Sequence, residues 1–279
     1  MDISSNMLLI KHNSTRKALN PSITTLSQGF QTIQLVFSLI EAVRLHRSLM
    51  YKRLTQQKVD AIAIAKAKDT LNTLSNRVAA YPYLGSGPER RILAIRLHQL
   101  IQNDHQQSLS KHLVLHGQVI RLLFFCCDCA VLMSLKGMKL SMVEYNHQWQ
   151  GLLDILDALT QYRISIGSAI QNGLRNPKLM VGRAHNLVSK IRRFDKTGFS
   201  NQQSLNTLTE QLTHSVHCLV YGQTPTLSQN PASSKEITIS TLYCDTSELS
   251  LQIFKVYKQV IKHQLERCIT AKANASISA

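Results

Sequence analysis

Helical periodicity is the feature that most limits the folds open to this chain. From about Ser22 to Cys218, apolar residues recur at spacings of three and four, whereas glycine and proline are sparse. The alternation of apolar and polar residues that marks a strand is almost absent. Short connections between long helices place successive helices antiparallel. The sequence therefore predicts an all-α fold of long antiparallel helices in up-and-down bundles, for example two four-helix bundles side by side.

Proline, glycine and polar clusters set the expected ends of the helices. The turn Tyr81–Pro88 ends one helix and lets Pro88 open the next. The composition of Tyr221–Lys235 is typical of a loop, and Ile237–Tyr243 has the alternation and β-branching of a short strand. We expect helices over about 22–56, 58–79, 89–105, 110–135, 141–172, 178–194, 201–218 and 246–271.

The chain is large enough to fold as one elongated domain or as two domains of ordinary size. It has 279 residues, of which 44% are hydrophobic, and it can therefore bury a substantial core. We expect a single helical domain over residues 21–272 with a loop at 221–235. A flexible segment at 1–20 precedes this domain and a frayed tail at 273–279 follows it.

Several features predict a cytoplasmic protein that does not insert into a membrane. The longest apolar run, Leu122–Leu135, contains Asp128 and falls short of the roughly 20 residues needed to cross a bilayer. The run Met7–Ile10 is too brief for the core of a signal peptide. Three cysteines at 126–129 lie on one apolar helix with poor geometry for bridging each other, so we expect reduced core residues.

Two arginines lie where a helical core would normally have an apolar side chain. Arg47 follows Val36, Ile40 and Val43 at spacings of four and three, and Arg163 follows Leu152, Leu156 and Leu159 in the same way. An unpaired buried guanidinium is costly, so each arginine needs either a carboxylate of the chain or a bound anion. Acids are scarce, because 16 Asp and Glu face 32 Lys and Arg. Our hypothesis is that the two arginines face each other across a shared interior.

A small planar oxyanion such as nitrate or nitrite fits this arrangement chemically. Its acceptor lone pairs lie in a plane that matches the guanidinium fork. Arg44 lies three residues before Arg47 on the same helix, and Arg163 approaches from a partner helix. We therefore expect an anion site formed by Arg44, Arg47 and Arg163. The alternative is that Arg47 is neutralised by Asp154, Asp157 or another internal acid.

The sequence predicts neither an enzyme nor a cofactor. No phosphate-binding glycine loop, nucleophile elbow, His-Glu-x-x-His pair or kinase signature is present, and the carboxylates form no acid–base pair. Metal binding needs three or four ligands that converge, and Ser108–Ser110 is expected to break the helix between the nearest candidates. We expect no metal site and exposed polar positions for the two histidine groups, His98, His105, His112 and His116, and His214 and His217 beside Cys218.

The net charge indicates a second candidate function, nucleic-acid binding. A charge of +16 and a pI near 9.8 predict attraction to nucleic acid or to anionic membrane surfaces. However, lysines and arginines form scattered clusters, aromatic residues are only 6%, and Trp149, Phe124 and Phe125 fall on apolar helical stripes that indicate a core. Nucleic-acid binding therefore stays an alternative to anion sensing, together with a structural bundle that has lost its ligand.

Three segments resemble the nitrate- and nitrite-sensing NIT domain family of bacterial signalling and antitermination proteins. Leu39–Met50 is similar to the family's first long helix, and Leu115–Arg121 and Leu156–Gly167 are similar to two later helices. The family motif is Arg-x-Arg-Gly. In this chain Leu45 stands at the position of its first arginine, and Ser48 stands at the position of its glycine. The resemblance carries over to Arg47 and Arg163, whereas Arg44 is one position from the family's first arginine.

The resemblance implies an all-helical sensor over roughly residues 25 to 270. It implies that the ligand is nitrate or nitrite. From the charges alone, we expect an anion bound between helices to neutralise arginines that repel each other and so to shift a helix. Members of the family usually carry an output module such as an RNA-binding, kinase, cyclase or chemoreceptor domain. This sequence has none of these modules, so we expect it to act on a separate output or regulatory protein, with a homodimer as one assembly to consider.

Overall fold

The computed structural model describes residues 23–102, 108–135, 142–195, 202–221 and 238–277. Within these ranges the chain forms eight helices and no strand, so the all-α prediction is confirmed. The helices are α2 (Ile23–Leu54), α3 (Ala61–Val78), α4 (Gly87–Gln102), α5 (Leu109–Leu135), α6 (Met142–Asn172), α7 (Pro177–Asp195), α8 (Gln202–Tyr221) and α9 (Ile239–Ile277).

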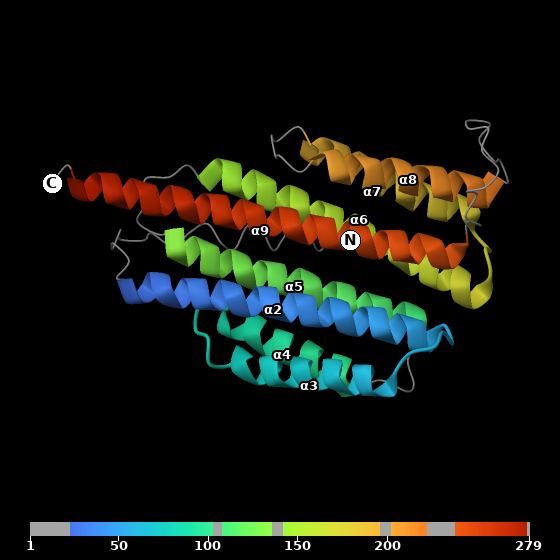
Figure 1. Ribbon diagram of the computed structural model, residues 1–279, viewed down its shortest axis with the longest axis horizontal. Coiled ribbons are helices and arrows are strands. Elements are labelled where there is room, and N and C mark those ends of the chain that lie inside the picture. The colour runs from blue at the N-terminus through green and yellow to red at the C-terminus, as the bar shows by residue number, and fades with distance from the viewer. Residues whose placement is uncertain (1–22, 103–107, 136–141, 196–201, 222–237, 278–279) are drawn as a thin grey trace.

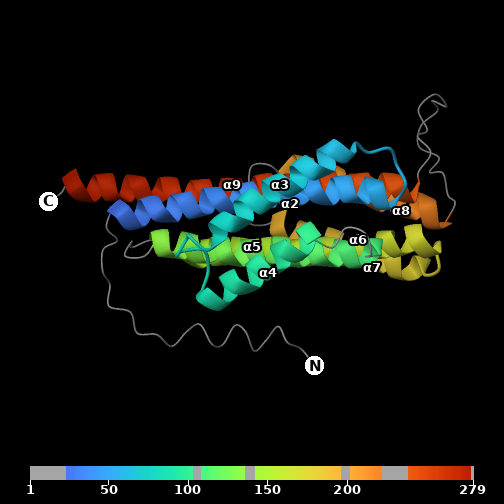
Figure 2. The ribbon, with the colours of Figure 1, turned by 90° about the horizontal axis from the view of Figure 1, so that it is seen from below.

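The helices form two four-helix bundles that lie side by side. In the first bundle α2 packs on α3 and α5, and α4 packs on α3 and α5. In the second bundle α6 packs on α7 and α9, and α8 packs on α7 and α9. Figure 1 shows α3 and α4 along one long side, α7 and α8 along the other, and α2, α5, α6 and α9 between them. Figure 2 shows that α3 and α4 are inclined to the long axis of the molecule.

Local capping explains where α3 and α4 begin. The Asp60 side chain accepts a hydrogen bond from the Ile62 backbone N–H at 2.9 Å and so caps α3. Before α4, the Ser86 backbone N–H donates to Glu89 Oε2 at 2.7 Å, and the Glu89 N–H donates to Ser86 Oγ at 3.4 Å. This reciprocal pair is a capping box, and Pro88 lies in the first turn as expected.

The four central helices bury the largest side chains of the molecule. Fully buried aromatic residues include Tyr145, Tyr162, Tyr243, Tyr257 and Phe124. The core positions predicted for the aromatic stripe are confirmed, since Trp149 and Phe124 are buried and Phe125 is partly buried against Trp149. Among the cysteines that the structure describes no disulfide forms, and Cys126 and Cys127 are buried in this core.

Helix α5 is the central apolar element of the first bundle. Its segment Leu109–Ser134 is long and apolar enough to cross a membrane by length and composition alone. More than half of this segment is buried, because α2, α4 and α6 all pack on α5. Burial inside the fold therefore accounts for its composition. Contact with α6 is close at Gly117, where a Cβ atom would lie 2.5 Å from Thr160 Cγ2.

The region after residue 237 differs from the prediction. Ile239 to Tyr243, expected as strand, form the first turns of α9, and this helix extends through residues 273–277 of the expected tail. Thr238 and Thr241 explain the early start, because each side-chain oxygen accepts a hydrogen bond from the other's backbone N–H. The expected flexible segment 1–20 and most of the expected loop 221–235 lie outside the described residues.

Candidate functional site

Arg47 and Arg163 lie near each other in the interior, where α2 and α6 meet α9. Arg47 is 3% exposed and Arg163 is 5% exposed. Arg163 donates from Nε to Thr246 Oγ1 at 3.1 Å and from Nη2 to the Thr246 carbonyl oxygen. Burial lowers the pKa of Arg163 well below its usual value, and the charge of Arg47 lowers it further. The structure thus places the two seam arginines close enough for their charges to interact.

Neither buried arginine forms an ion pair with a carboxylate in the described parts of the chain. The two acids considered as internal partners are bound elsewhere, since Asp157 pairs with Arg121 at 2.8 Å and Asp154 pairs with Lys190 at 2.7 Å. Burial lowers the pKa of Arg47, and the neighbouring Tyr243 opposes this shift. Arg47 Nε has no hydrogen-bond partner. The alternative of neutralisation by Asp154 or Asp157 is therefore wrong.

Arg44 lies at the edge of the same cluster. Its side chain is half-buried, and Nη2 donates to the Ser247 carbonyl oxygen at 3.5 Å. Burial and the charge of Arg47 lower its pKa to about 10, whereas Glu248 and Glu41 raise it. Carboxylates therefore balance Arg44 in part, although they do not reach the two deeper arginines. Binding of an anion by the three arginines stays a prediction.

Three buried histidines lie beside the arginines. His112 and His116 lie four residues apart on α5, and His46 directly precedes Arg47 on α2. One nitrogen from each ring lies within 4.8 Å of the others. His46 Nδ1 is 3.0 Å from His116 Nε2, and His116 Nδ1 is 2.8 Å from the His112 carbonyl oxygen.

The positions expected for these histidines were wrong in part. His112 and His116 are buried, because the α5 face that carries them packs on α2. His98 is exposed on α4, and His105 lies outside the described residues. Their spacing of four was the available sequence signal, since it places both rings on one face of a helix. The third member, His46, is 66 residues away from His112 and could be found only once the packing of α2 on α5 was known.

Burial keeps the three histidines neutral near pH 7. It lowers the pKa of His46 to about 4, with a smaller contribution from Lys68. It lowers the pKa of His112 to about 3, with further lowering by His46 and Arg47, and lowers the pKa of His116 well below its usual value. The site therefore combines positively charged guanidinium groups with neutral imidazoles that carry lone pairs.

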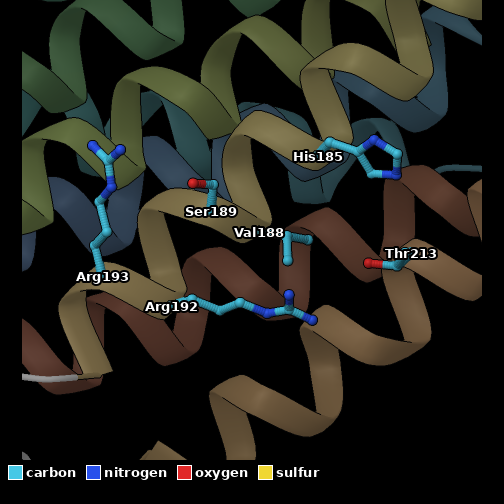
Figure 3. A pocket seen from close by; sticks show the side chains of 6 residues that line it. All are labelled: His185, Val188, Ser189, Arg192, Arg193 and Thr213. Atoms are coloured by element: carbon cyan, nitrogen blue, oxygen red, sulfur yellow. The ribbon is translucent and has the colours of Figure 1, made fainter.

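A basic surface hollow on α7 and α8 is separate from this cluster. It has a volume of about 360 Å³ and is lined by His185, Val188, Ser189, Arg192, Arg193 and Thr213. Figure 3 shows Arg192 extending toward α8 and Arg193 pointing the other way. None of the lining residues belongs to the buried arginine or histidine groups.

The second histidine group of the sequence analysis lies at the surface. His214 and His217 are exposed on α8, as expected, and His214 Nε2 is 3.6 Å from Cys218 Sγ.

No known protein family, characterised protein or solved structure matches this chain. The resemblance to the NIT family therefore stays a prediction that rests on its three segments. In the structure, Leu39–Met50 lies in α2, Leu115–Arg121 in α5 and Leu156–Gly167 in α6. These segments carry the buried arginines Arg47 and Arg163 and the buried His46 and His116.

Proposed function

We propose that this chain is a non-enzymatic sensor that binds a small oxyanion, nitrate or nitrite, between α2, α6 and α9 and signals to a separate partner. The observation that carries the proposal is the pair of buried guanidinium groups, Arg47 and Arg163, which have no carboxylate partner among the described residues. A buried charge without a counterion is strongly unfavourable. A bound anion is the partner that removes this cost.

The contacts of the arginines suit a planar anion. Thr246 holds the Arg163 guanidinium through two of its nitrogens, so the orientation of the group is set before a ligand arrives. Arg47 Nε is buried without a hydrogen-bond partner and is available as a donor. Charge-assisted hydrogen bonds from guanidinium groups to an oxyanion are short and strong. Arg44 adds positive charge at the edge of the same cluster.

Binding at this position provides a route for a signal. Arg163 contacts α9 at Thr246, Arg44 contacts α9 at Ser247, and the ring of Tyr51 on α2 stacks on the ring of Tyr243. The arginines repel each other when no anion is bound. Neutralisation by an anion would draw α2 and α6 closer to α9, and the shift of α9 is the change that a partner protein would detect.

The test is thermal unfolding in matched ionic strengths of nitrate, nitrite and chloride. A ligand that binds only the native state raises its stability, by about 2.7 kcal/mol at 100 times the dissociation constant. We expect a rise for one oxyanion in the wild type and no such rise in Arg47→Met. Arg91→Met, which changes an exposed arginine on α4, should keep the wild-type response. Equal midpoints of the wild type in all three salts would refute oxyanion sensing.

Nucleic-acid binding is the second candidate function. The observation that favours it is the hollow on α7 and α8 with two exposed arginines, together with the net charge of +16. Binding to phosphates would release counterions. The logarithm of the affinity for RNA would therefore fall linearly with the logarithm of the salt concentration. In a fluorescence anisotropy titration, the double change Arg192→Ala and Arg193→Ala should reduce this slope by about 2, whereas Arg47→Met should leave it unchanged. If neither ligand binds, a structural bundle is the function that remains.

A further inference from the structure

The three buried histidines have the residue spacing and separations of a metal site. On α5, His112 and His116 are one helical turn apart on one face, and His46 faces them from α2. The nitrogens of four-coordinate zinc ligands lie about 3.3 Å apart, given metal–nitrogen bonds of about 2.05 Å. The separation of 3.0 Å between His46 Nδ1 and His116 Nε2 is close to this value, and all three ligand atoms lie within 4.8 Å of one another.

The hydrogen bonds show which His116 nitrogen can act as a ligand. A carbonyl oxygen only accepts hydrogen bonds, so His116 Nδ1 carries the hydrogen that it donates to the His112 carbonyl. Nε2 of His116 therefore keeps its lone pair, which accepts a hydrogen bond from His46 Nδ1 at 3.0 Å in the structure and which a metal ion would take in its place. A backbone carbonyl that orients a histidine in this way is the usual outer partner of a metal-bound imidazole.

Two further nitrogens of the group lack partners. His46 Nε2 and His112 Nε2 are both buried and make no hydrogen bond. Buried polar atoms are almost always paired, so the unpaired Nε2 of His112 indicates a ligand, whereas Nε2 of His46 is the ring nitrogen that does not face His116. This observation does not depend on the arginines.

We infer that His46, His112 and His116 bind one divalent transition-metal ion of the class that prefers imidazole, such as Zn²⁺. Three neutral imidazoles are a known ligand set for this ion and leave its fourth position open. The group contains no carboxylate or thiolate, so the ion would keep its charge beside Arg47. An anionic fourth ligand would offset this repulsion, and only this last step rests on the proposed oxyanion binding.

The experiment uses Co²⁺ as the probe with the full chain after removal of metals by a chelator. Tetrahedral Co²⁺ gives visible absorption bands, and metal analysis after desalting gives the stoichiometry. We expect one equivalent of Co²⁺ in the wild type, displaced by Zn²⁺. Loss of an outer partner costs about 10- to 100-fold in affinity, so loss of a direct ligand in His112→Gln or His116→Gln should cost more than about 100-fold.

Control variants separate this site from the surface histidines. His98→Gln on α4 and Cys218→Ser on α8 should keep the full equivalent of Co²⁺, and circular dichroism should show unchanged helicity in every variant. The inference is overturned if the wild type binds no Co²⁺, if a folded His112→Gln and a folded His116→Gln both retain it, or if Cys218→Ser loses it.

One further variant separates the metal site from the anion site. Arg47→Met removes a positive charge near the histidines and should bind Co²⁺ at least as tightly as the wild type while losing its response to nitrate or nitrite. Co²⁺ binding in the wild type without any oxyanion response would contradict the proposed function alone. An oxyanion response without Co²⁺ binding would contradict the metal site alone.

Discussion

At the interface between α2 and α9, the positive charges at the rim and those at the centre differ in whether a carboxylate lies beside them. At the rim, Lys258 Nζ lies 2.6 Å from Glu41 Oε1 and also lies over the rings of Phe37 and Phe254. Lys258 and Glu41 are both exposed by more than a third. At the centre, Arg47 is buried, and no described carboxylate forms an ion pair with it.

This difference is the reverse of what charge burial alone would favour. An ion pair contributes little at the surface, where water already solvates both groups, whereas an uncompensated charge is most costly in the interior. The surface cations Lys258, Lys190 and Arg121 nevertheless have carboxylate partners, and among the described residues Arg47 and Arg163 do not. A centre that only stabilised the fold would be expected to have the opposite arrangement. The comparison thus supports a ligand that enters from outside the chain.

Of the changes considered, acidification should have the largest effect on the stability of the protein. Burial lowers the pKa values of His46 and His112 to about 4 and about 3, so the native state stays neutral where the unfolded state takes up protons. Stability is therefore full above the unfolded pKa near 6.5 and is lost progressively as pH falls below it. Three such groups, including His116, should together cost about 4 kcal/mol between about pH 7 and about pH 5.5.

Urea unfolding of metal-free protein across this pH range would measure the loss. His116→Gln should remove about a third of the pH dependence, because one of three titrating groups is gone. His98→Gln, an exposed change on α4, should keep the wild-type dependence. A wild-type protein whose stability does not change over the range would mean that the histidines are not held neutral in a dry interior.

Most of the fold could be predicted from local sequence patterns. The expected ends of α5 and α6 agree with the structure to within one residue, because Leu109–Leu135 and Met142–Asn172 have clear periodicity between polar breaks. The start of α9 was missed because β-branching in Ile239 and Thr241 favours strand locally. Capping by Thr238 and burial of Leu242 in the core overrode that preference.

Only the site residues whose sequence pattern lies within a single helix could be predicted. Arg47 and Arg163 each interrupt an apolar seam within a single helix, so their burial could be inferred from spacing. The histidine cluster depends on the pairing of α2 with α5, which no local pattern specifies. For the same reason, the sequence did not reveal that Asp154 forms an ion pair with Lys190 and that Asp157 forms one with Arg121.

Replacing Arg47 by an apolar residue should have the next largest effect. Arg47→Met keeps much of the side-chain volume and removes a buried charge, so we expect the free energy of unfolding without ligand to rise by about 1 to 3 kcal/mol. Arg121→Met breaks an exposed ion pair with Asp157 and should lower it by less than about 1 kcal/mol. Denaturant unfolding of both variants would show whether the two changes have opposite signs. Destabilisation by Arg47→Met would indicate that the chain itself compensates this charge.

A pair of glycine substitutions tests how tightly the centre is packed. Gly117 on α5 faces Thr160, and a Cβ atom there would lie 2.5 Å from a methyl group, whereas Gly182 on α7 has open space. Overpacking costs about 1 to 3 kcal/mol, and alanine gains about 1 kcal/mol of helix propensity, so Gly117→Ala should destabilise by about 1 kcal/mol. Gly182→Ala should stabilise by up to about 1 kcal/mol. Equal effects on the midpoint of thermal unfolding would show that α5 and α6 are not in close contact beside His116.

The smallest effect is expected at the rim. Glu41→Gln removes the partner of Lys258, and because both groups are exposed the cost should stay below about 1 kcal/mol and should shrink at high salt. Glu41 also raises the pKa of Arg44, so its removal leaves the arginine cluster more positive. The oxyanion-dependent rise in the unfolding midpoint should then increase slightly, even though the protein without ligand is slightly less stable. A loss above about 2 kcal/mol that persists at high salt would mean that the rim pair behaves as a buried one, and the contrast with Arg47 would no longer hold.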